Sequence, residues 1–159
     1  MAIRKTKKRA LNAVKIICLQ DGAIDEEASD FDLYRKDPIG NADALKFLPN
    51  EKPTYFICNF EVSGKEMAII KDSMTGGVDD EKNVKTNFGK WAYTVVKMTL
   101  KVIDNPPEVK DGIELKFDSK RYVSDATMTD LEQCGVLGEI FQHWITLTQT
   151  NEERANAKN

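Results

Sequence analysis

The chain has 159 residues, of which 41% are hydrophobic and 31% are charged, and its formal net charge is −3. This length and composition predict one globular domain that folds without a metal ion or disulfide bonds. They exclude a transmembrane helix, which needs an apolar run of roughly 18 residues, and the sequence begins without the apolar core of a secretory signal. We therefore expect a protein that stays in the cytoplasm of the cell that makes it.

Charge is distributed unevenly along the chain. Residues 1–9 hold five cations and no acid: Arg4, Lys5, Lys7, Lys8 and Arg9. We predict that this segment is a basic N-terminal arm and that these five side chains bind a partner, either an acidic protein surface or phosphate groups. The alternative is an arm that only keeps the chain in solution. An acidic run follows at residues 21–32, where six Asp and Glu residues occur without a base.

The first third of the chain carries weak secondary-structure signals. Apolar residues predict a short strand at residues 14–19. Alternation of apolar and polar residues at 31–34 favours an edge strand or an extended docking segment. The turn-forming residues between 36 and 52 indicate a loop, with at most one helical turn near residues 42–47.

The segment after Pro53 is the strongest strand candidate, because residues 53–62 are rich in aromatic and β-branched side chains. Ser63 and Glu66 then have the spacing of a capping box, in which each side chain accepts a hydrogen bond from an amide of the other residue. A helix should start there and stop at Gly76 and Gly77.

A long amphipathic helix is predicted for residues 80–104. Apolar side chains, among them Phe88 and Trp91, recur at steps of three and four residues, which places them on one helical face. Two aromatic rings on this stripe must be covered by other elements. The helix must end before Pro106.

The remaining elements are an alternating strand at residues 113–117 and a final helix from about Thr129, where Glu132 completes a second capping box. A polar tail at residues 151–159 should fray. The predicted organisation is thus an arm (1–9), one domain (10–150) and a tail (151–159). The fold class is α+β, with a small sheet packed by about three helices, the longest around residues 80–104.

Residues suited to catalysis or metal binding are sparse. The chain has one histidine, His143, which we interpret as a half-exposed structural residue, and three widely spaced cysteines, which we interpret as buried thiols. The acidic run lacks the ligand spacing of an EF-hand, and we interpret it as solvated or helix-start charge. We therefore predict no enzyme activity, no cofactor and no metal site.

Trp91 and Trp144 lie on apolar stripes, which indicates core packing rather than base stacking.

Several features occur in an order that resembles small virion and tail-assembly proteins of tailed bacteriophages. They are the Asp37-Pro38 turn, the extended segment from Pro53 to Phe56 with the capped helix at Glu66, the helix with Trp91, the Asp111-Gly112 turn, and a terminal helix that leads to Glu152, Glu153 and Arg154. The resemblance implies a non-enzymatic part that binds other virion proteins or copies of itself, in the virion or the host cytoplasm.

Two functions remain open at this stage. In the first, the chain is a structural or assembly protein of the tail or head-tail region, whose basic arm and acidic run contact neighbouring proteins. In the second, the chain is a small nucleic-acid-binding regulator that uses the same arm. Phosphate contacts would make the second interaction strongly dependent on salt.

Overall fold

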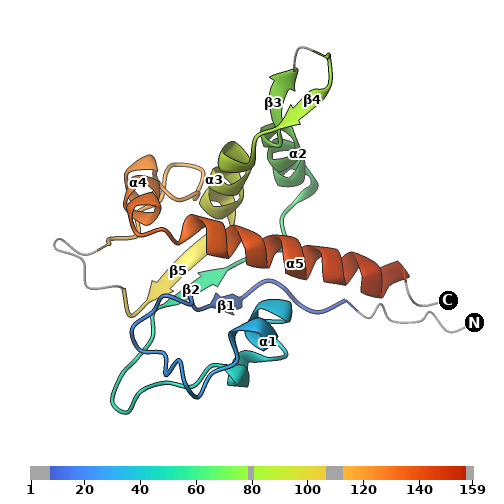
Figure 1. Cartoon of the computed structure of the whole chain (residues 1–159). Coiled ribbons are helices and arrows are strands. Elements are labelled where there is room, and N and C mark those ends of the chain that lie inside the picture. Colours follow the sequence, from blue (N-terminus) through green and yellow to red (C-terminus); the bar gives the residue numbers. More distant parts are fainter. Residues whose placement is uncertain (1–7, 79–80, 107–112, 157–159) are drawn as a thin grey trace, which may run out of the picture.

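The computed structural model describes residues 8–78, 81–106 and 113–156, and it confirms the α+β class (Figure 1). In chain order the elements are β1 (Val14–Ile16), α1 (Phe31–Lys36), the 3-10 helix η1 (Ala42–Ala44), β2 (Tyr55–Cys58), α2 (Gly64–Ser73), β3 (Thr75–Val78), β4 (Val84–Thr86), α3 (Phe88–Thr99), β5 (Leu100–Asp104), α4 (Asp125–Gln133) and α5 (Leu137–Asn156). No helix within the described ranges is long and apolar enough to cross a bilayer.

The main sheet has three antiparallel strands in the order β1-β2-β5. Ile16 pairs with Phe56, and Phe56 pairs with Ile103, so one side chain from each strand lies on the same face. Ile16 and Phe56 are buried in the main apolar cluster, which also contains residues of α3, α4 and α5. The strands predicted at 14–19 and 53–62 are confirmed over Val14–Ile16 and Tyr55–Cys58.

Helices α3 and α5 close on each other through aromatic side chains, as the apolar stripes predict. Trp91 of α3 lies edge-on to Phe141 and Trp144 of α5, with ring centroids 4.9 and 6.1 Å away. Phe141 and Trp144 are themselves stacked at 6.3 Å. Both tryptophans therefore belong to the packed interior rather than to an open nucleic-acid surface.

The prediction of one long helix over residues 80–104 is wrong. The described residues of this stretch form β4, the 12-residue helix α3 and then β5, and the longest helix is α5 with 20 residues. Asn87 starts α3, because its Oδ1 accepts a hydrogen bond from the Lys90 amide at 3.0 Å. After Thr99 the chain becomes extended and pairs with β2, so tertiary strand pairing overrides the helical spacing of Val102.

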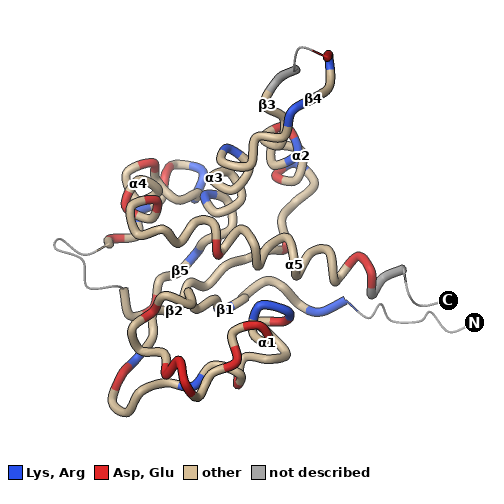
Figure 2. The backbone as a smooth tube through the Cα atoms, viewed as in Figure 1, with Lys and Arg blue, Asp and Glu red and all other residues tan. Residues whose placement is uncertain are grey.

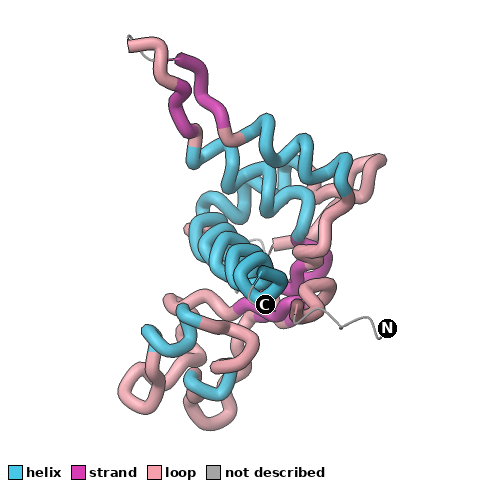
Figure 3. The backbone as a smooth tube through the Cα atoms, turned by 90° about the vertical axis from the view of Figure 1, so that its right-hand side faces the viewer, coloured by secondary structure: helices cyan, strands magenta, loops and turns pink. Residues whose placement is uncertain are grey.

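The predicted capping box at Ser63 and Glu66 is confirmed, and it starts α2. A two-stranded hairpin of β3 and β4 follows, which the sequence did not predict beyond the break at Gly76. The hairpin links α2 to α3 and extends away from the helices (Figure 3). Its base is closed by a hydrogen bond of 2.7 Å from the Asn87 amide to the Met74 carbonyl.

Residues 17–52, here called the N-terminal lobe, have a small apolar cluster of their own: Ile17, Ile24, Tyr34, Ala44 and Leu45. The prediction that residues 31–34 are extended is wrong, because these residues belong to α1. Asp30 caps this helix by accepting a hydrogen bond from the Leu33 amide at 3.0 Å. The helical turn predicted near 42–47 is confirmed as η1.

The C-terminal third differs from the prediction in three places. Residues 113–117 form no strand, only an isolated bridge from Phe117 to Val123. The single final helix is two helices: Ser124 caps α4, and Gly135, with φ at +71°, separates α4 from α5. Helix α5 continues to Asn156, so the predicted boundary at residue 151 falls inside it.

Candidate functional site

A cavity of about 550 Å³ lies where four segments meet. The segments are residues 18–23 and 51–56, which belong to the N-terminal lobe and the start of β2, residues 105–106 after β5, and residues 134–136 between α4 and α5. Its volume is within the range of pockets that bind ligands or side chains of a partner. It is the strongest candidate site among the described residues, and we call it the junction pocket.

Hydrogen bonds between the four segments fix the wall of the junction pocket. The Asp21 carboxylate accepts from the amides of Ala23 and Thr54 at 2.9 and 2.8 Å. Thr54 in turn donates its hydroxyl to the Asn105 carbonyl at 2.6 Å, and Gln20 donates its side-chain amide to the Cys134 carbonyl at 2.8 Å. The pocket therefore exists before any ligand arrives, because its polar groups already hold each other in place.

The charge of this wall is negative. Asp21 and Glu51 contribute two carboxylates, and Glu51 is exposed and forms no ion pair within the described ranges. Lys52 also lines the pocket, but its Nζ lies 3.7 Å from Asp104, so its charge is already matched. Acidic residues outnumber basic ones in the N-terminal lobe, where Figure 2 shows more red than blue along the backbone.

A further carboxylate lies behind the wall. Glu139, in the first turn of α5, accepts a hydrogen bond from the Leu19 amide at 3.2 Å through Oε1. Its Oε2 is buried and has no hydrogen-bond partner in the described part of the chain. Burial, and then the hydrogen bond to Glu139, raise the pKa of the neighbouring Cys18 thiol. Cys18 therefore stays protonated and is a weak nucleophile.

Cysteine burial follows the prediction for two of the three residues. Cys18 and Cys58 are buried, whereas Cys134 is half-buried at the junction pocket. Burial raises the pKa of Cys58 to about 12.

In the ranges that the structure describes, no group of three or more Cys, His, Asp or Glu side chains could hold a metal ion. The pocket wall carries the carboxylates of Asp21 and Glu51, which suit a cationic ligand.

The predicted partner-binding residues fall into two groups. Arg4, Lys5 and Lys7 lie outside the described residues, and Lys8 is exposed. Arg9 is engaged within the chain: its guanidinium donates to both oxygens of the Asp37 carboxylate. This hydrogen bonding lowers the pKa of Asp37 to about 2. The residues that precede Arg9 therefore start from a fixed point on the body.

His143 differs from the prediction of a half-exposed residue, because only 5% of its surface is exposed. The N-terminal lobe covers this face of α5, and the Tyr34 ring lies edge-on to the imidazole at 5.5 Å. Burial, and then the charge of Arg35, lower the pKa of His143 to about 4. Its Nδ1 has no hydrogen-bond partner among the described residues. The imidazole is therefore neutral at pH 7.

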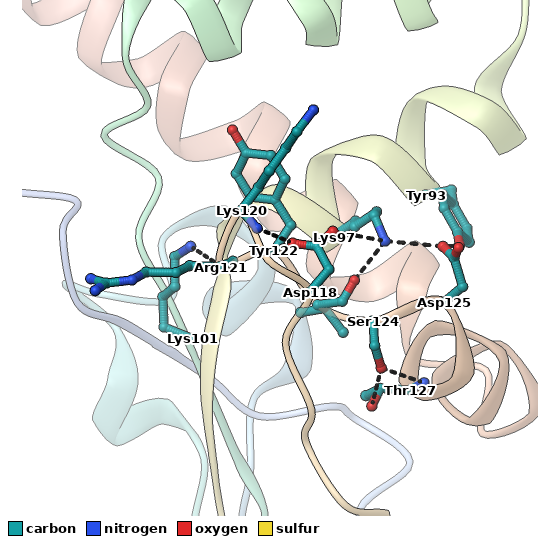
Figure 4. A network of polar contacts seen from close by, with 11 residues as sticks. Tyr93, Lys97, Lys101, Asp118, Lys120, Arg121, Tyr122, Ser124, Asp125 and Thr127 are labelled. Atoms are coloured by element: carbon teal, nitrogen blue, oxygen red, sulfur yellow. Dashed lines mark hydrogen bonds and ion pairs between the residues drawn. The ribbon is translucent and has the colours of Figure 1, made fainter.

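A second polar cluster surrounds Lys97 at the end of α3 (Figure 4). Its Nζ donates to the Val123 carbonyl at 2.7 Å and to Asp125 at 3.0 Å, and lies 3.8 Å from Asp118. Tyr93 donates its hydroxyl to Asp125 at 2.6 Å. These contacts join α3 to the turn at Asp118 and to the start of α4, so this cluster is a structural clamp.

Comparison with known protein families, with curated proteins and with solved structures finds no match. A proposal of function consequently depends on the sequence and the geometry of this chain alone.

The junction pocket was not found by sequence reasoning. Its two carboxylates, Asp21 and Glu51, are 30 positions apart, and neither belongs to a recognisable ligand motif. The acidic run did indicate where negative charge would gather. Within that run Asp30 is helix-start charge and Glu26 and Glu27 are exposed, as interpreted from the sequence.

Proposed function

We propose that the chain is a non-enzymatic assembly protein that acts through protein–protein contacts in the tail or head-tail region of a bacteriophage particle. The observation that carries this proposal is the hairpin of β3 and β4, which extends from the body between α2 and α3 (Figures 1 and 3). Its strands pair with each other and with no other strand of the described chain. A two-stranded ribbon of this kind is only marginally stable in water, and a partner would stabilise it.

An exposed aromatic side chain lies at the base of the hairpin. Phe88, the first residue of α3, is 64% exposed, which is the highest value among the large apolar side chains of the described ranges. Its ring lies tilted against that of Trp91, with the centroids 6.1 Å apart, so part of the side chain contacts the body and most of it faces solvent. Aromatic residues in such positions are common anchors in protein interfaces.

The backbone of the hairpin offers a second means of recognition. In a two-stranded ribbon each strand has one side without a strand partner, and a neighbouring protein can add a strand there. Main-chain hydrogen bonds would then supply affinity, while Phe88 would supply a side-chain anchor. Both features belong to the same end of the molecule, which supports a contact surface at the hairpin.

The test is replacement of Phe88 by serine in the phage genome. We expect the purified variant to keep its thermal stability, because the side chain is mostly exposed, and the yield of infectious particles to fall at least roughly tenfold through loss of an anchor worth about 2 kcal/mol. The matched control is Leu48→Ser, which changes an apolar residue that is 41% exposed on the N-terminal lobe. Phe88→Tyr should retain assembly.

Two results would contradict the proposal. One is a normal particle yield with Phe88→Ser. The other is a catalytic or nucleic-acid phenotype that persists when particles and their assembly intermediates contain no copy of the chain, as measured by mass spectrometry of purified fractions.

A further inference from the structure

We infer that the junction pocket of one copy holds the basic residues that precede Arg9 in another copy, so that copies join head to tail. This inference rests on the proposed function only in that the chain acts through protein–protein contacts, and it does not involve the hairpin. It assigns a role to the junction pocket and names its occupant, the segment of residues 1–8.

Charge complementarity is the first argument. The segment of residues 1–8 carries four cations, Arg4, Lys5, Lys7 and Lys8, and no acid. The pocket wall carries Asp21 and Glu51, with Glu139 behind it, and its one lysine is already paired with Asp104. Residues 21–51 contain nine Asp and Glu against three Lys and Arg, so the surface around the pocket attracts the same segment.

The chemistry of the wall suits long cationic side chains. Pro106 is exposed and provides apolar surface on which the methylene groups of Lys or Arg can pack, above the buried side chains of Phe56 and Val136. The exposed Glu51 carboxylate is available as an acceptor for a charged end, and Asp21, whose two oxygens already accept backbone amides, adds negative charge beside it. Ammonium and guanidinium groups are donors only, and this wall offers acceptors.

The positions of segment and pocket along α5 give the second argument. Arg9 is fixed beside Asn151, near the end of α5: the Arg9 amide donates to Asn151 Oδ1, and Asn151 Nδ2 donates to the Arg9 carbonyl, both at 3.0 Å. Cys134 and Val136 of the pocket directly precede the start of this helix at Leu137. Arg9, from which the segment leaves the body, and the pocket therefore lie at opposite ends of α5 (Figure 1).

Occupation within the same copy is disfavoured by length. The helix rises by about 1.5 Å per residue, so Leu137 and Asn151 are separated by about 21 Å. Eight fully extended residues span at most about 26–29 Å. A segment that returned to the pocket of its own copy would use about six of its eight residues to cross the length of α5. Only two residues would remain to enter the pocket. Between copies placed end to end, all four cations can reach the pocket. Such a heterologous contact generates a ring or a filament.

The first experiment is a charge exchange, measured by sedimentation velocity of the full chain. Reversal of the segment (Lys5→Glu, Lys7→Glu and Lys8→Glu) and reversal of the pocket (Glu51→Lys) should each weaken self-association at least tenfold. Glu51 is exposed, so the fold should survive, and its melting temperature verifies this. An equimolar mixture of the two variants should associate again, because each reversed surface finds its complement.

A mixture that remains monomeric overturns the inference. So does a wild-type chain that is monomeric at low salt and associates only when DNA or RNA is added.

The second experiment is a crosslink. Lys5→Cys places a thiol in the segment, and diamide as oxidant should join it to Cys134, which is half-buried at the pocket. The expected product is a disulfide between two copies, identified by peptide mapping and absent in the Lys5→Cys, Cys134→Ser control. A disulfide within one copy, or none to Cys134, overturns the inference. Phe88→Ser should crosslink normally, so failure of the hairpin proposal and failure of this one are distinguishable.

Discussion

Asn151 satisfies both backbone hydrogen-bonding groups of Arg9 across 142 positions of sequence. A residue near the end of α5 thus fixes the point from which the basic segment leaves the body. The side chain of Arg9 adds a second attachment, because it binds Asp37 next to α1. The N-terminal lobe and α5 are therefore joined through one residue.

The Arg9–Asp37 pair predicts an acid-sensitive component of stability. The pKa of Asp37 is lowered to about 2 in the folded state, so this contribution is present above the unfolded pKa near 4 and is lost as the pH falls toward 2. Both side chains are about one quarter exposed, so solvent screening limits the contribution at pH 7 to about 1–2 kcal/mol.

Asp37→Asn should lower the free energy of unfolding by about 1–2 kcal/mol at pH 7. The difference from wild type should shrink as the pH falls from 4 to 2. The control is Asp32→Asn, since the Asp32–Arg35 pair is largely exposed and should contribute below about 0.5 kcal/mol. Urea denaturation at several pH values measures both. Equal effects of the two substitutions would argue against the Arg9 attachment.

His143 predicts a second pH dependence, at milder acidity. Its folded-state pKa of about 4 is below the unfolded value near 6.5, so the folded state resists protonation. Stability should be complete above pH 6.5 and should decline by about 3 kcal/mol as the pH falls from 6.5 to 4. His143→Phe should remove the slope in this window. An unchanged slope would assign the dependence to other groups.

Loss of the Lys97 clamp should destabilise the contact between α3 and α4. Lys97→Met removes a charge-assisted hydrogen bond to the Val123 carbonyl, which contributes about 1–3 kcal/mol. The melting temperature should fall by about 2–10 °C. Lys90→Met, an exposed position on the same helix, should leave it unchanged. Calorimetry of the two variants decides whether the clamp is structural.

Two glycines near the start of α5 should respond in opposite directions. Gly135→Ala forces a side chain into left-handed geometry and should cost about 1–2 kcal/mol. Gly138→Ala lies in the helix with open space around the added methyl group, and should stabilise by up to about 1 kcal/mol. Thermal denaturation of both variants tests whether Gly135 separates two helices.

Local signals in the sequence predicted local structure well. The capping box at Ser63 and Glu66 and the strand within 53–62 depend on neighbouring residues, and the structure confirms both. The helix predicted for 80–104 was wrong because spacing alone cannot show that Leu100–Asp104 finds a strand partner in β2. Residues 31–34 are helical rather than extended because Asp30 caps α1, and the alternation of apolar residues carries no information about this cap.

The candidate site was beyond prediction for a related reason. The junction pocket is assembled from segments far apart in the chain, and only the fold brings Asp21, Glu51 and Cys134 to one wall. Burial of His143 likewise depends on how the N-terminal lobe covers α5. The sequence could indicate the charges of the arm and of the acidic run, but not their places along the helix.

Both tryptophans of the chain belong to the cluster in which Trp91 lies edge-on to Trp144 and to Phe141. Intrinsic fluorescence therefore reports on a single event, the separation of α3 from α5. Its emission should shift to the red when these helices part, and it should stay constant when only the N-terminal segment changes partners. The molecule thus carries its own optical probe for distinguishing unfolding from association through that segment.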